Sequence, residues 1–286
     1  MSYSVPAPAK INLALHVVGQ RSDGYHLLET LVVFADFGDR IQVEDAERDH
    51  FTIEGPYAAD LDASAPNLVT RARDALRRET NKAAAPLAIR LEKNLPVASG
   101  IGGGSADAAA TLNAIAALRG IEPALLTNVA PSLGADVPMC LAGAPLLARG
   151  AGERIEPLNH FPALDLVLVN PGVAVSTPAV FSALATKHNP PLPTLPAIAA
   201  ARDAAGWLAT AANHLQPPAV ALEPAIDAAL DEITQSGALL ARMSGSGATC
   251  FGLYADRASA EHAAHAILTA RPGWFIKAVR TGEARR

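Results

Sequence analysis

The residues most able to do chemistry form a glycine-rich segment between a predicted strand and a predicted helix. Glycine lets the main chain approach a ligand closely, so that successive N–H groups converge on an anion. The helix that follows adds the positive end of its dipole, and Ser105 offers a hydroxyl group to a phosphate oxygen or a metal. This pattern predicts a polyphosphate site, whereas a flexible surface loop is the alternative. The segment, called the glycine loop below, consists of Pro96, Val97, Ala98, Ser99, Gly100, Ile101, Gly102, Gly103, Gly104, Ser105 and Ala106.

Two common phosphate-binding motifs do not describe this loop. The chain contains no Gly-Lys pair, which excludes the Walker motif. The dinucleotide fingerprint GxGxxG fails as well, because Ser105 stands where its third glycine would follow Gly100 and Gly102. The glycine loop therefore predicts a phosphate site of another class and by itself leaves the substrate open.

The elements around the loop predict an α+β fold with two domains. The first part is rich in strands, and an alanine-rich helix over 105–119 follows the loop directly. The second part reads strand, helices, two strands, helix, strand, which is typical of a ferredoxin-like layer. We place the border near Gly150, giving domains 1–150 and 151–286. We expect strands over 11–18, 27–37, 40–44, 51–54, 87–93, 165–170, 238–243, 249–254 and 274–279. Further helices are expected over 67–80, 123–133, 176–184 and 259–270, and between the proline-rich stretch and residue 236. An exposed turn is expected over 134–138, and a proline-rich stretch that is flexible or extended over 188–196.

Composition narrows the class of protein. The 286 residues are half hydrophobic and 18% charged, which is typical of a globular chain. A net charge of −5 argues against nucleic acid as a partner, because a phosphate backbone needs a basic surface. Cys140 and Cys250 have no metal-ligand spacing, so no zinc site or disulfide framework is expected. No signal peptide or run long enough to span a membrane is visible, and we expect a cytoplasmic protein.

Three motifs resemble a known family. The glycine loop is similar to the second motif of the galacto-, homoserine, mevalonate and phosphomevalonate (GHMP) kinase superfamily. The segment 244–248, Ser-Gly-Ser-Gly-Ala, is similar to its third motif, and 8–13, Pro-Ala-Lys-Ile-Asn-Leu, to its first. The three occur in the family's order and span nearly the whole chain. One group of members fits best through 19–26 and 133–138, namely kinases of the non-mevalonate route to isoprenoids.

The resemblance implies a fold, a reaction and a substrate. The fold would be a ribosomal-protein-S5-like N-terminal domain with a left-handed βαβ unit, followed by a ferredoxin-like C-terminal domain, with the active site in the cleft between them. The reaction would transfer a phosphoryl group from ATP, with Mg²⁺ expected, to the 2-hydroxyl of a polyol linked to cytidine diphosphate. We expect no nucleic acid or membrane partner, and a monomer or weak homodimer. Ala98, Ser99 and Ile101 depart mildly from the family's usual loop residues.

The same resemblance makes Asp136 the catalytic base and Lys10 its partner. Asp136 lies in a predicted turn, where the alternative is a carboxylate that bonds to its own backbone. Lys10 stands among apolar residues, where an ammonium group needs a partner, although an edge-strand lysine that reaches solvent is the alternative. Asn12 would face the same side of the strand and contact the polyol; its alternative is a turn residue.

Further residues are assigned to the two ends of the substrates. Tyr25, His26 and Phe181 would form the cytosine pocket, although a histidine and a phenylalanine in such places are often ordinary surface or core residues. Asn67 either reaches the adenosine of ATP or caps the helix that begins beside it. The two glycines of the third motif, Gly245 and Gly247, would let a turn approach substrate or phosphate, and a plain hairpin turn is the alternative.

Two other functions remain open at this point. The chain could be another kinase of the superfamily with a homoserine or mevalonate-like acceptor, which would not need the cytosine pocket. It could also be a relative that only binds a ligand, although the presence of both Lys10 and Asp136 argues for catalysis.

Overall fold

The computed structural model describes residues 1–62 and 66–282, which form two compact units. Unit 1 consists of Met1–Ala9, Gly38–Val97 and Gly102–Gly143. Unit 2 consists of Lys10–Phe37, Ala98–Ile101 and the described residues from Ala144 onward. The predicted border near Gly150 stays a prediction. The last residues of the predicted second domain, 283–286, lie outside the described part of the chain.

Two long strands, β1 (Ser2–Gln20) and β2 (His26–Asp45), pair with each other and contribute residues to both units. The sequence predicted two shorter strands, 27–37 and 40–44, where β2 runs without a break. Gly38 explains the difference, because a Cβ atom there would lie 2.1 Å from the Ala7 carbonyl oxygen of β1. Gly38, which lies between the two predicted strands, is therefore the residue that lets the two backbones pass.

Unit 1 contains a βαβ arrangement. The C-terminal half of β2 pairs antiparallel with β4 (Leu87–Glu92), and β3 (His50–Glu54) pairs parallel with β4. Helix α1 (Leu68–Glu79) joins β3 to β4 and packs against α2 (Gly103–Arg119). The remaining elements of unit 1 are α3 (Pro123–Val129), α4 (Val137–Ala142) and the 3₁₀ turns Ala58–Asp60, Asn81–Ala83 and Ala130–Ser132.

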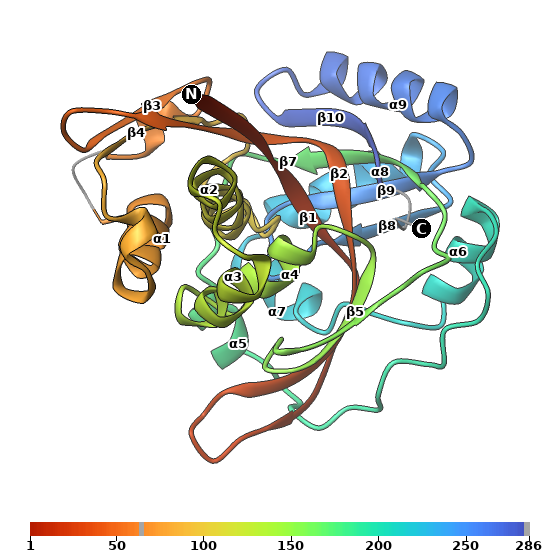
Figure 1. Cartoon of the computed structure of the whole chain (residues 1–286). Coiled ribbons are helices and arrows are strands. Elements are labelled where there is room, and N and C mark those ends of the chain that lie inside the picture. Colours follow the sequence, from red (N-terminus) through yellow and green to blue (C-terminus); the bar gives the residue numbers. More distant parts are fainter. Residues whose placement is uncertain (63–65, 283–286) are drawn as a thin grey trace. The chain divides into compact units, whose positions relative to one another are not determined.

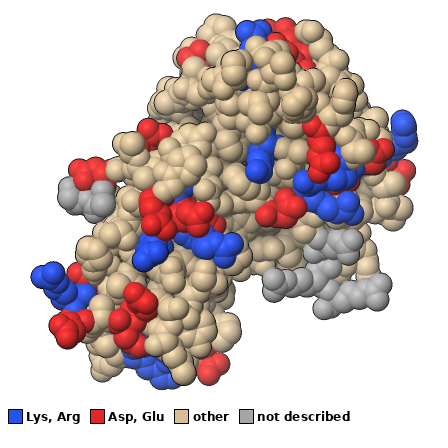
Figure 2. Space-filling view, turned by 90° about the horizontal axis from the view of Figure 1, so that it is seen from above, with Lys and Arg blue, Asp and Glu red and all other residues tan. Residues whose placement is uncertain are grey.

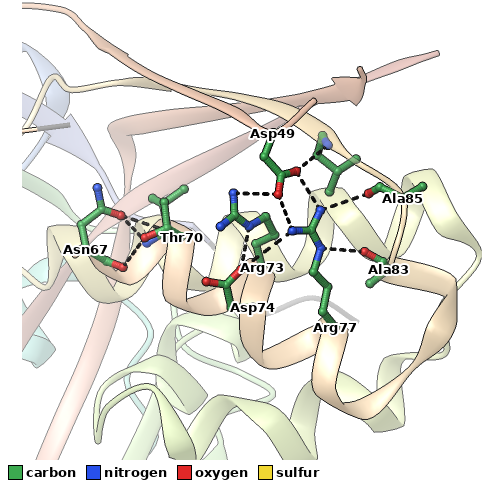
Figure 3. Close-up of polar contacts among 10 residues, drawn as sticks. Asp49, Asn67, Thr70, Arg73, Asp74, Arg77, Ala83 and Ala85 are labelled. Atoms are coloured by element: carbon green, nitrogen blue, oxygen red, sulfur yellow. Dashed lines mark hydrogen bonds and ion pairs between the residues drawn. The ribbon is translucent and has the colours of Figure 1, made fainter. Parts of the chain in front are cut away.

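An ion-paired carboxylate joins α1 to the strands around it (Figure 3). Asp49 accepts two hydrogen bonds from the Arg77 guanidinium, at 2.5 and 2.8 Å, and another from the Leu87 backbone N–H at 2.9 Å. Arg77 also donates to the carbonyl oxygens of Ala83 and Ala85. Hydrogen bonds from Arg77 and Leu87 hold the pKa of the Asp49 carboxyl well below its usual range. This cluster ties the end of α1 to the start of β4.

Unit 2 contains the predicted ferredoxin-like layer. Its four-stranded sheet has the order β10-β7-β9-β8, and every neighbouring pair is antiparallel (Figure 1). Helices α8 and α9 pack on this sheet and supply much of its buried apolar core. The elements are β7 (Asp165–Asn170), β8 (Leu240–Met243), β9 (Cys250–Tyr254), β10 (Phe275–Arg280), α8 (Ala225–Gln235) and α9 (Arg257–Ala270).

The rest of unit 2 adds two strands beside β2 and three short helices. The N-terminal half of β2 pairs with β5 (Leu146–Gly150), which pairs with β6 (Arg154–Pro157). The short helices are α5 (Thr177–Ser182), α6 (Ala201–Leu208) and α7 (Gln216–Leu222). The proline-rich stretch 188–196 contains neither helix nor strand, as predicted.

Two further predicted elements differ from the structure, besides β2 and besides β1, which is longer than the predicted strand 11–18. The helix expected over 123–133 ends as an α-helix at Val129, because Pro131 lacks the N–H that a further turn requires, and a 3₁₀ turn follows. The expected exposed turn over 134–138 is cut short, since α4 begins at Val137, whose side chain is buried. Its proline, Pro138, occupies the second position of that helix, where a missing N–H costs nothing.

Two further observations concern the membrane and the surface charge. No helix among the described residues is long and apolar enough to cross a membrane. On the face drawn in Figure 2, lysines and arginines lie intermixed with aspartates and glutamates, so that no single sign of charge dominates a broad area of that face.

Candidate functional site

The unit 2 part of the glycine loop, Ala98–Ile101, lies against the turn Ser244–Ala248, called the Ser244 turn below. The Thr249 backbone N–H donates to the Ser99 carbonyl oxygen at 3.0 Å. The Ser244 hydroxyl donates to the Gly100 carbonyl oxygen at 3.1 Å and accepts from the Asn12 N–H at 3.0 Å. The Ser244 hydroxyl of the third motif therefore bonds to backbone atoms of both the first motif, at Asn12, and the second motif, at Gly100.

Glycine is required at this contact for two physical reasons. A Cβ atom on Gly100 would lie 2.6 Å from the Gly247 carbonyl oxygen, and one on Gly245 would lie 2.7 Å from the Gly100 carbonyl oxygen. Both residues also have positive φ angles, +77° and +55°, which disfavour a side chain. Gly245 and Gly247 thus have a structural partner in the loop itself, beside the substrate role that the sequence predicted for them, which stays a prediction.

The unit 1 part of the loop forms the start of α2. Helix α2 begins at Gly103, two residues earlier than predicted, and its N-cap residue Gly102 has a φ angle of +67°. No side chain in the described part of the chain caps this end of the helix. Four backbone N–H groups at a helix N-terminus lack partners inside the helix, and they attract anions. Ser105 is the third residue of α2, so it belongs to this first turn, and it is partly exposed.

Lys10 and Asn12 lie side by side in β1, as their spacing predicted. The Lys10 ammonium donates to Asn12 Oδ1 at 3.0 Å, and Asn12 Nδ2 donates to the Thr30 hydroxyl at 2.8 Å. Thr30 in turn donates to the Ala14 carbonyl oxygen at 2.7 Å. Lys10 is 3% exposed, which rules out the alternative of an edge lysine that reaches solvent.

The structure brings His26 and Phe181 together from distant parts of the chain. Their rings stack with centroids 4.7 Å apart and an interplanar angle of 27°. Phe181 comes from α5 and packs at the edge of the unit 2 core. Burial and the nearby charge of Lys187 lower the pKa of His26, which favours a neutral imidazole. Tyr25 is 63% exposed beside them, in the turn between β1 and β2.

One nitrogen of His26 stands out. The Nε2 atom is buried, and within residues 1–62 and 66–282 it has no hydrogen-bond partner. An imidazole nitrogen without a partner is costly when buried, and a ligand group that bonds to it removes that cost. The arrangement therefore has a stacking surface, a neutral imidazole and a polar atom that lacks a partner in the protein.

Asn67 and Asp136 both precede helices of unit 1. Asn67 Oδ1 accepts from the backbone N–H groups of Val69 and Thr70 at 2.9 and 3.1 Å, so the predicted capping role is confirmed (Figure 3). Its contact with adenosine stays a prediction. Asp136 is the half-buried residue before α4, and its side chain does not cap that helix. Its role as a base stays a prediction, and so does the alternative of a carboxylate that bonds to its own backbone.

Several residues that support the site were not predicted from the sequence. Thr30 and Ser244 orient Asn12 and the glycine loop, but a lone threonine in a strand or a serine in a turn carries no signal of such a role. Asp39, Lys93 and Asp107 form a buried ion-paired cluster in unit 1. Lys93 and Asp107 flank the loop in sequence, and a charged residue close to apolar neighbours on each side of the loop was the signal that could have found them.

The donor set fits a magnesium ion that arrives with ATP. Among the described residues, no group of three or more His, Cys, Asp or Glu side chains could hold a metal by itself. Mg²⁺ commonly keeps several waters and binds phosphate oxygens with one or two protein oxygens. Ser105 at the start of α2 can supply such an oxygen.

Comparison with known families and relatives agrees with the three motifs. The chain matches the GHMP kinases N terminal domain over residues 67–144 and the GHMP kinases C terminal domain over residues 195–271. It is 57% identical to the 4-diphosphocytidyl-2-C-methyl-D-erythritol kinase of Sinorhizobium medicae, over 97% of this chain and 95% of that protein. It is 55% identical to the kinase of the same name from Agrobacterium fabrum, over 96% of this chain and 95% of the relative.

Solved structures agree as well. A crystal structure of 4-(cytidine 5'-diphospho)-2C-methyl-D-erythritol kinase is 36% identical, with a TM-score of 0.80, covering 99% of this chain and 100% of the other. A homoserine kinase from Cytophaga hutchinsonii is 20% identical with a TM-score of 0.66, covering 100% of this chain and 96% of the other, which shows the shared fold alone. The predicted α+β fold of this kinase superfamily is confirmed.

Proposed function

The chain belongs to the 4-diphosphocytidyl-2-C-methyl-D-erythritol kinases within the GHMP kinase family, and from that premise we propose the chemistry of its site. The chain is an ATP-dependent phosphotransferase. Its acceptor is the 2-hydroxyl of 4-diphosphocytidyl-2-C-methyl-D-erythritol, in the non-mevalonate route to isoprenoid precursors. The observation that carries this proposal is the 57% identity to a kinase of that name, which extends over 97% of this chain.

ATP binds through its phosphates to the glycine loop. The N–H groups at the start of α2 receive phosphate oxygens, since no side chain caps that helix end. Ser105 would offer its hydroxyl group to the Mg²⁺ that accompanies ATP, and such an ion would offset the negative charge of the phosphates. Asn67 caps α1 with Oδ1 and contacts the adenosine end of ATP.

Asp136 is the general base, and Lys10 assists it. Asp136 accepts the proton of the 2-hydroxyl while the alcohol oxygen forms a bond to the γ-phosphorus. The bond from that phosphorus to the β–γ bridging oxygen breaks, and ADP leaves with the electron pair. The positive charge of Lys10 favours the transferring phosphoryl group, and its hydrogen bond to Asn12 Oδ1 directs the Asn12 amide toward the polyol.

The cytosine of the acceptor binds at Tyr25, His26 and Phe181. Stacked rings suit a flat base, and Tyr25 is exposed enough to add a further face. The His26 Nε2 atom, which has no hydrogen-bond partner within residues 1–62 and 66–282, supplies the polar contact to the edge of cytosine. Homoserine and mevalonate contain no nucleobase, so neither acceptor would occupy this pocket. A cytoplasmic location and the oligomeric state stay predictions.

Coupled measurement of ADP release tests the proposal. We expect turnover with 4-diphosphocytidyl-2-C-methyl-D-erythritol and none with homoserine or mevalonate at the same concentrations. Turnover with one of the other alcohols and none with the cytidine compound would refute the assigned acceptor.

The Asp136→Asn variant tests the role of Asp136 as the general base. We expect kcat to fall about 10²- to 10⁴-fold, which is the usual contribution of a positioned base. The ATP dissociation constant should stay within about twofold of the wild type, because phosphate binding uses the loop. A variant that keeps full kcat would remove Asp136 from the reaction, and a matched loss of ATP binding would point to misfolding.

A further inference from the structure

Asn213 is a buried asparagine that the proposed mechanism does not use. It lies between α6 and α7 and is 4% exposed. Its Nδ2 atom donates to the carbonyl oxygens of Met243 and Gly245, both at 2.8 Å, and its Oδ1 atom accepts from the Leu215 N–H at 2.9 Å. A carbonyl oxygen can only accept and an N–H can only donate, so these partners determine which end of the amide is nitrogen. Both donors of Asn213 therefore hold the carbonyl groups on either side of Ser244.

Ser244 is the residue through which the third motif contacts the other two. Its hydroxyl accepts from the Asn12 N–H and donates to the Gly100 carbonyl oxygen. A Cβ atom on Gly245 would lie 3.4 Å from Asn12 Oδ1, so this glycine borders the Asn12 amide itself. The Asn213 amide therefore acts on the surroundings of Asn12 through the residues whose carbonyl groups it holds.

The backbone around Asn213 holds strand β1, the other side of that contact. Asn213 forms a parallel bridge with Leu15, which lies three residues after Asn12 in β1. The Leu15 N–H donates to the Ala212 carbonyl oxygen, and the Leu15 carbonyl oxygen accepts from the His214 N–H, both at 2.9 Å. One short segment thus fixes β1 through its backbone and the third motif through its side chain.

A buried arginine strengthens the same connection. Arg242 is 8% exposed and directly precedes the residues that Asn213 holds. Its guanidinium donates to three backbone carbonyl oxygens, those of Leu13 at 2.9 Å and of Leu208 and Ala211 at 2.8 Å. Because the guanidinium is planar and rigid, these bonds fix β1, the end of α6 and β8 relative to one another.

The Ser244 turn needs this support because two of its residues are glycines. Gly245 and Gly247 have φ angles of +55° and +89°. Glycine has access to more backbone conformations than any other residue, so a turn with two glycines keeps one conformation only if other groups hold it. Asn213 bonds to one carbonyl group just before this turn and to one at its first glycine. All of these residues belong to unit 2.

We propose that Asn213 is a positioning residue for phosphoryl transfer, because its amide holds Ser244 where it orients Asn12 and the glycine loop. The inference rests on the proposed function, in which Asn12 contacts the polyol and the loop binds the ATP phosphates. Without the two N–H donors, the turn loses its conformation and Asn12 loses its alignment. The transfer step then slows, since it depends on alignment, whereas cytosine still binds at its own pocket.

The Asn213→Ala variant tests the inference in steady-state assays with ATP and 4-diphosphocytidyl-2-C-methyl-D-erythritol. We expect kcat to fall about 10- to 100-fold and KM for the cytidine compound to stay within about threefold of the wild type. Asn189→Ala is the matched control, because Asn189 Nδ2 also donates to two carbonyl oxygens, those of Val17 and Thr186. The control should keep kcat within about twofold of the wild type. Equal kcat values in the two variants would overturn the inference.

A double-mutant cycle with Ser244→Ala tests whether Asn213 acts through Ser244. Adding Asn213→Ala to Ser244→Ala should lower kcat by less than about a further twofold, because the side chain that the amide holds in place is already absent. A further loss as large as that of Asn213→Ala alone would mean that the two residues act independently, which contradicts the proposal.

Amide hydrogen exchange separates this inference from the proposed function, because it needs no substrate. The Asn12 N–H, which donates to the Ser244 hydroxyl, should exchange at least about tenfold faster in Asn213→Ala and at the wild-type rate in Asn189→Ala. An unchanged rate in Asn213→Ala would refute the positioning role even in an active enzyme. Faster exchange in a chain whose wild type does not phosphorylate the cytidine compound would instead refute the proposed function.

Asn213→Asp replaces the alanine variant if urea unfolding shows that the latter does not fold. Aspartate has the same shape and keeps an acceptor for the Leu215 N–H, but an ionised carboxylate has no donor for the two carbonyl groups. We expect the same loss of kcat and the same faster exchange at Asn12. In the wild type, the side-chain N–H₂ protons of Asn213 should exchange more slowly than those of the exposed Asn81, and equal rates would refute the inference without any variant.

Discussion

Among single residues, Asn12 shows how neighbours determine what a side chain can offer a ligand. Its Oδ1 accepts from the Lys10 ammonium and its Nδ2 donates to the Thr30 hydroxyl, which fixes the orientation of the amide. Thr30 can accept this bond because its own proton goes to the Ala14 carbonyl oxygen. Three successive hydrogen bonds thus determine that the Asn12 amide oxygen faces Lys10 and the amide nitrogen faces Thr30.

Thr30→Val should therefore reduce activity without touching the substrate. Valine has nearly the same shape but leaves Asn12 Nδ2 and the Ala14 carbonyl oxygen without partners, at a cost of about 1–3 kcal/mol in unfolding free energy. We expect kcat/KM for the acceptor to fall about tenfold, because the amide loses its single orientation. Steady-state kinetics and urea unfolding measure both effects.

Thr234→Val is the matched control for that variant. Its hydroxyl also donates to a backbone carbonyl oxygen, that of Leu230 in α8. We expect a small loss of stability and unchanged kinetics. Equal kcat/KM values in the two variants would mean that the Asn12 orientation has no part in the reaction.

At the scale of elements, the glycine loop depends on a second loop behind it. The Ser244 turn contacts Ala98–Ile101 through backbone atoms, at a separation that leaves no room for a side chain. The third motif is thus the surface against which part of the second is formed. Strand β1 joins the same contact, since the Lys10 N–H donates to the Ile101 carbonyl oxygen at 2.9 Å.

Gly100→Ala should disrupt this contact. Its Cβ atom would meet two carbonyl oxygens, at 2.6 and 2.7 Å, and its φ angle of +77° adds strain. Backbone must move, and a displacement of about 1 Å at a phosphate loop can cost about 10²-fold in rate. We expect kcat/KM for ATP to fall by at least about tenfold in steady-state assays.

Gly237→Ala isolates the contribution of the backbone angle. Gly237 has a similar φ of +88°, but apart from its chain neighbours no atom of the described residues lies within 4 Å of the position of its Cβ atom. We expect a loss of about 1–2 kcal/mol in unfolding free energy and unchanged ATP kinetics. If Gly100→Ala behaved in the same way, close packing of the two turns would not be what the loop requires.

At the scale of the whole molecule, two carboxyl groups give stability opposite dependences on pH. The folded pKa of Asp49 is depressed, so its contribution is present above the unfolded pKa of about 4 and is lost as the pH falls further. The folded pKa of Asp107 is raised to about 8, so the folded state binds a proton that the unfolded state has released. Between about pH 4 and 8 this second group lowers stability as the pH rises.

Two variants should separate these contributions in urea unfolding from pH 2.5 to 9. Asp107→Asn should flatten the decline between pH 5 and 8. Asp49→Asn should flatten the loss below pH 4 and cost about 1 kcal/mol at pH 7, a small value because the side chain is 35% exposed. An unaltered pH profile in either variant would refute the assignment for that residue.

Local sequence patterns predicted much of the fold and a phosphate site, and the resemblance of three motifs to a kinase family predicted the class of reaction. The glycine loop, its following helix and the strand order of the C-terminal layer all depend on short-range chemistry and hydrophobic periodicity. They predicted α2 to within two residues at its start, the cap at Asn67 and the ferredoxin-like sheet. Lys10 and Asn12 were placed on one side of a strand because side chains there alternate with a period of two.

Tertiary structure alone decided which distant residues meet. Nothing in the sequence near Gly38 distinguishes a strand break from a close crossing, because only the approach of β1 at Ala7 makes the glycine necessary. The stacking of His26 on Phe181 and the pairing of Lys93 with two aspartates likewise join segments whose separation carries no local signal. Short-range patterns predicted a phosphate loop, but long-range packing determined what supports it, since burial and ion pairing depend on neighbours from elsewhere in the chain.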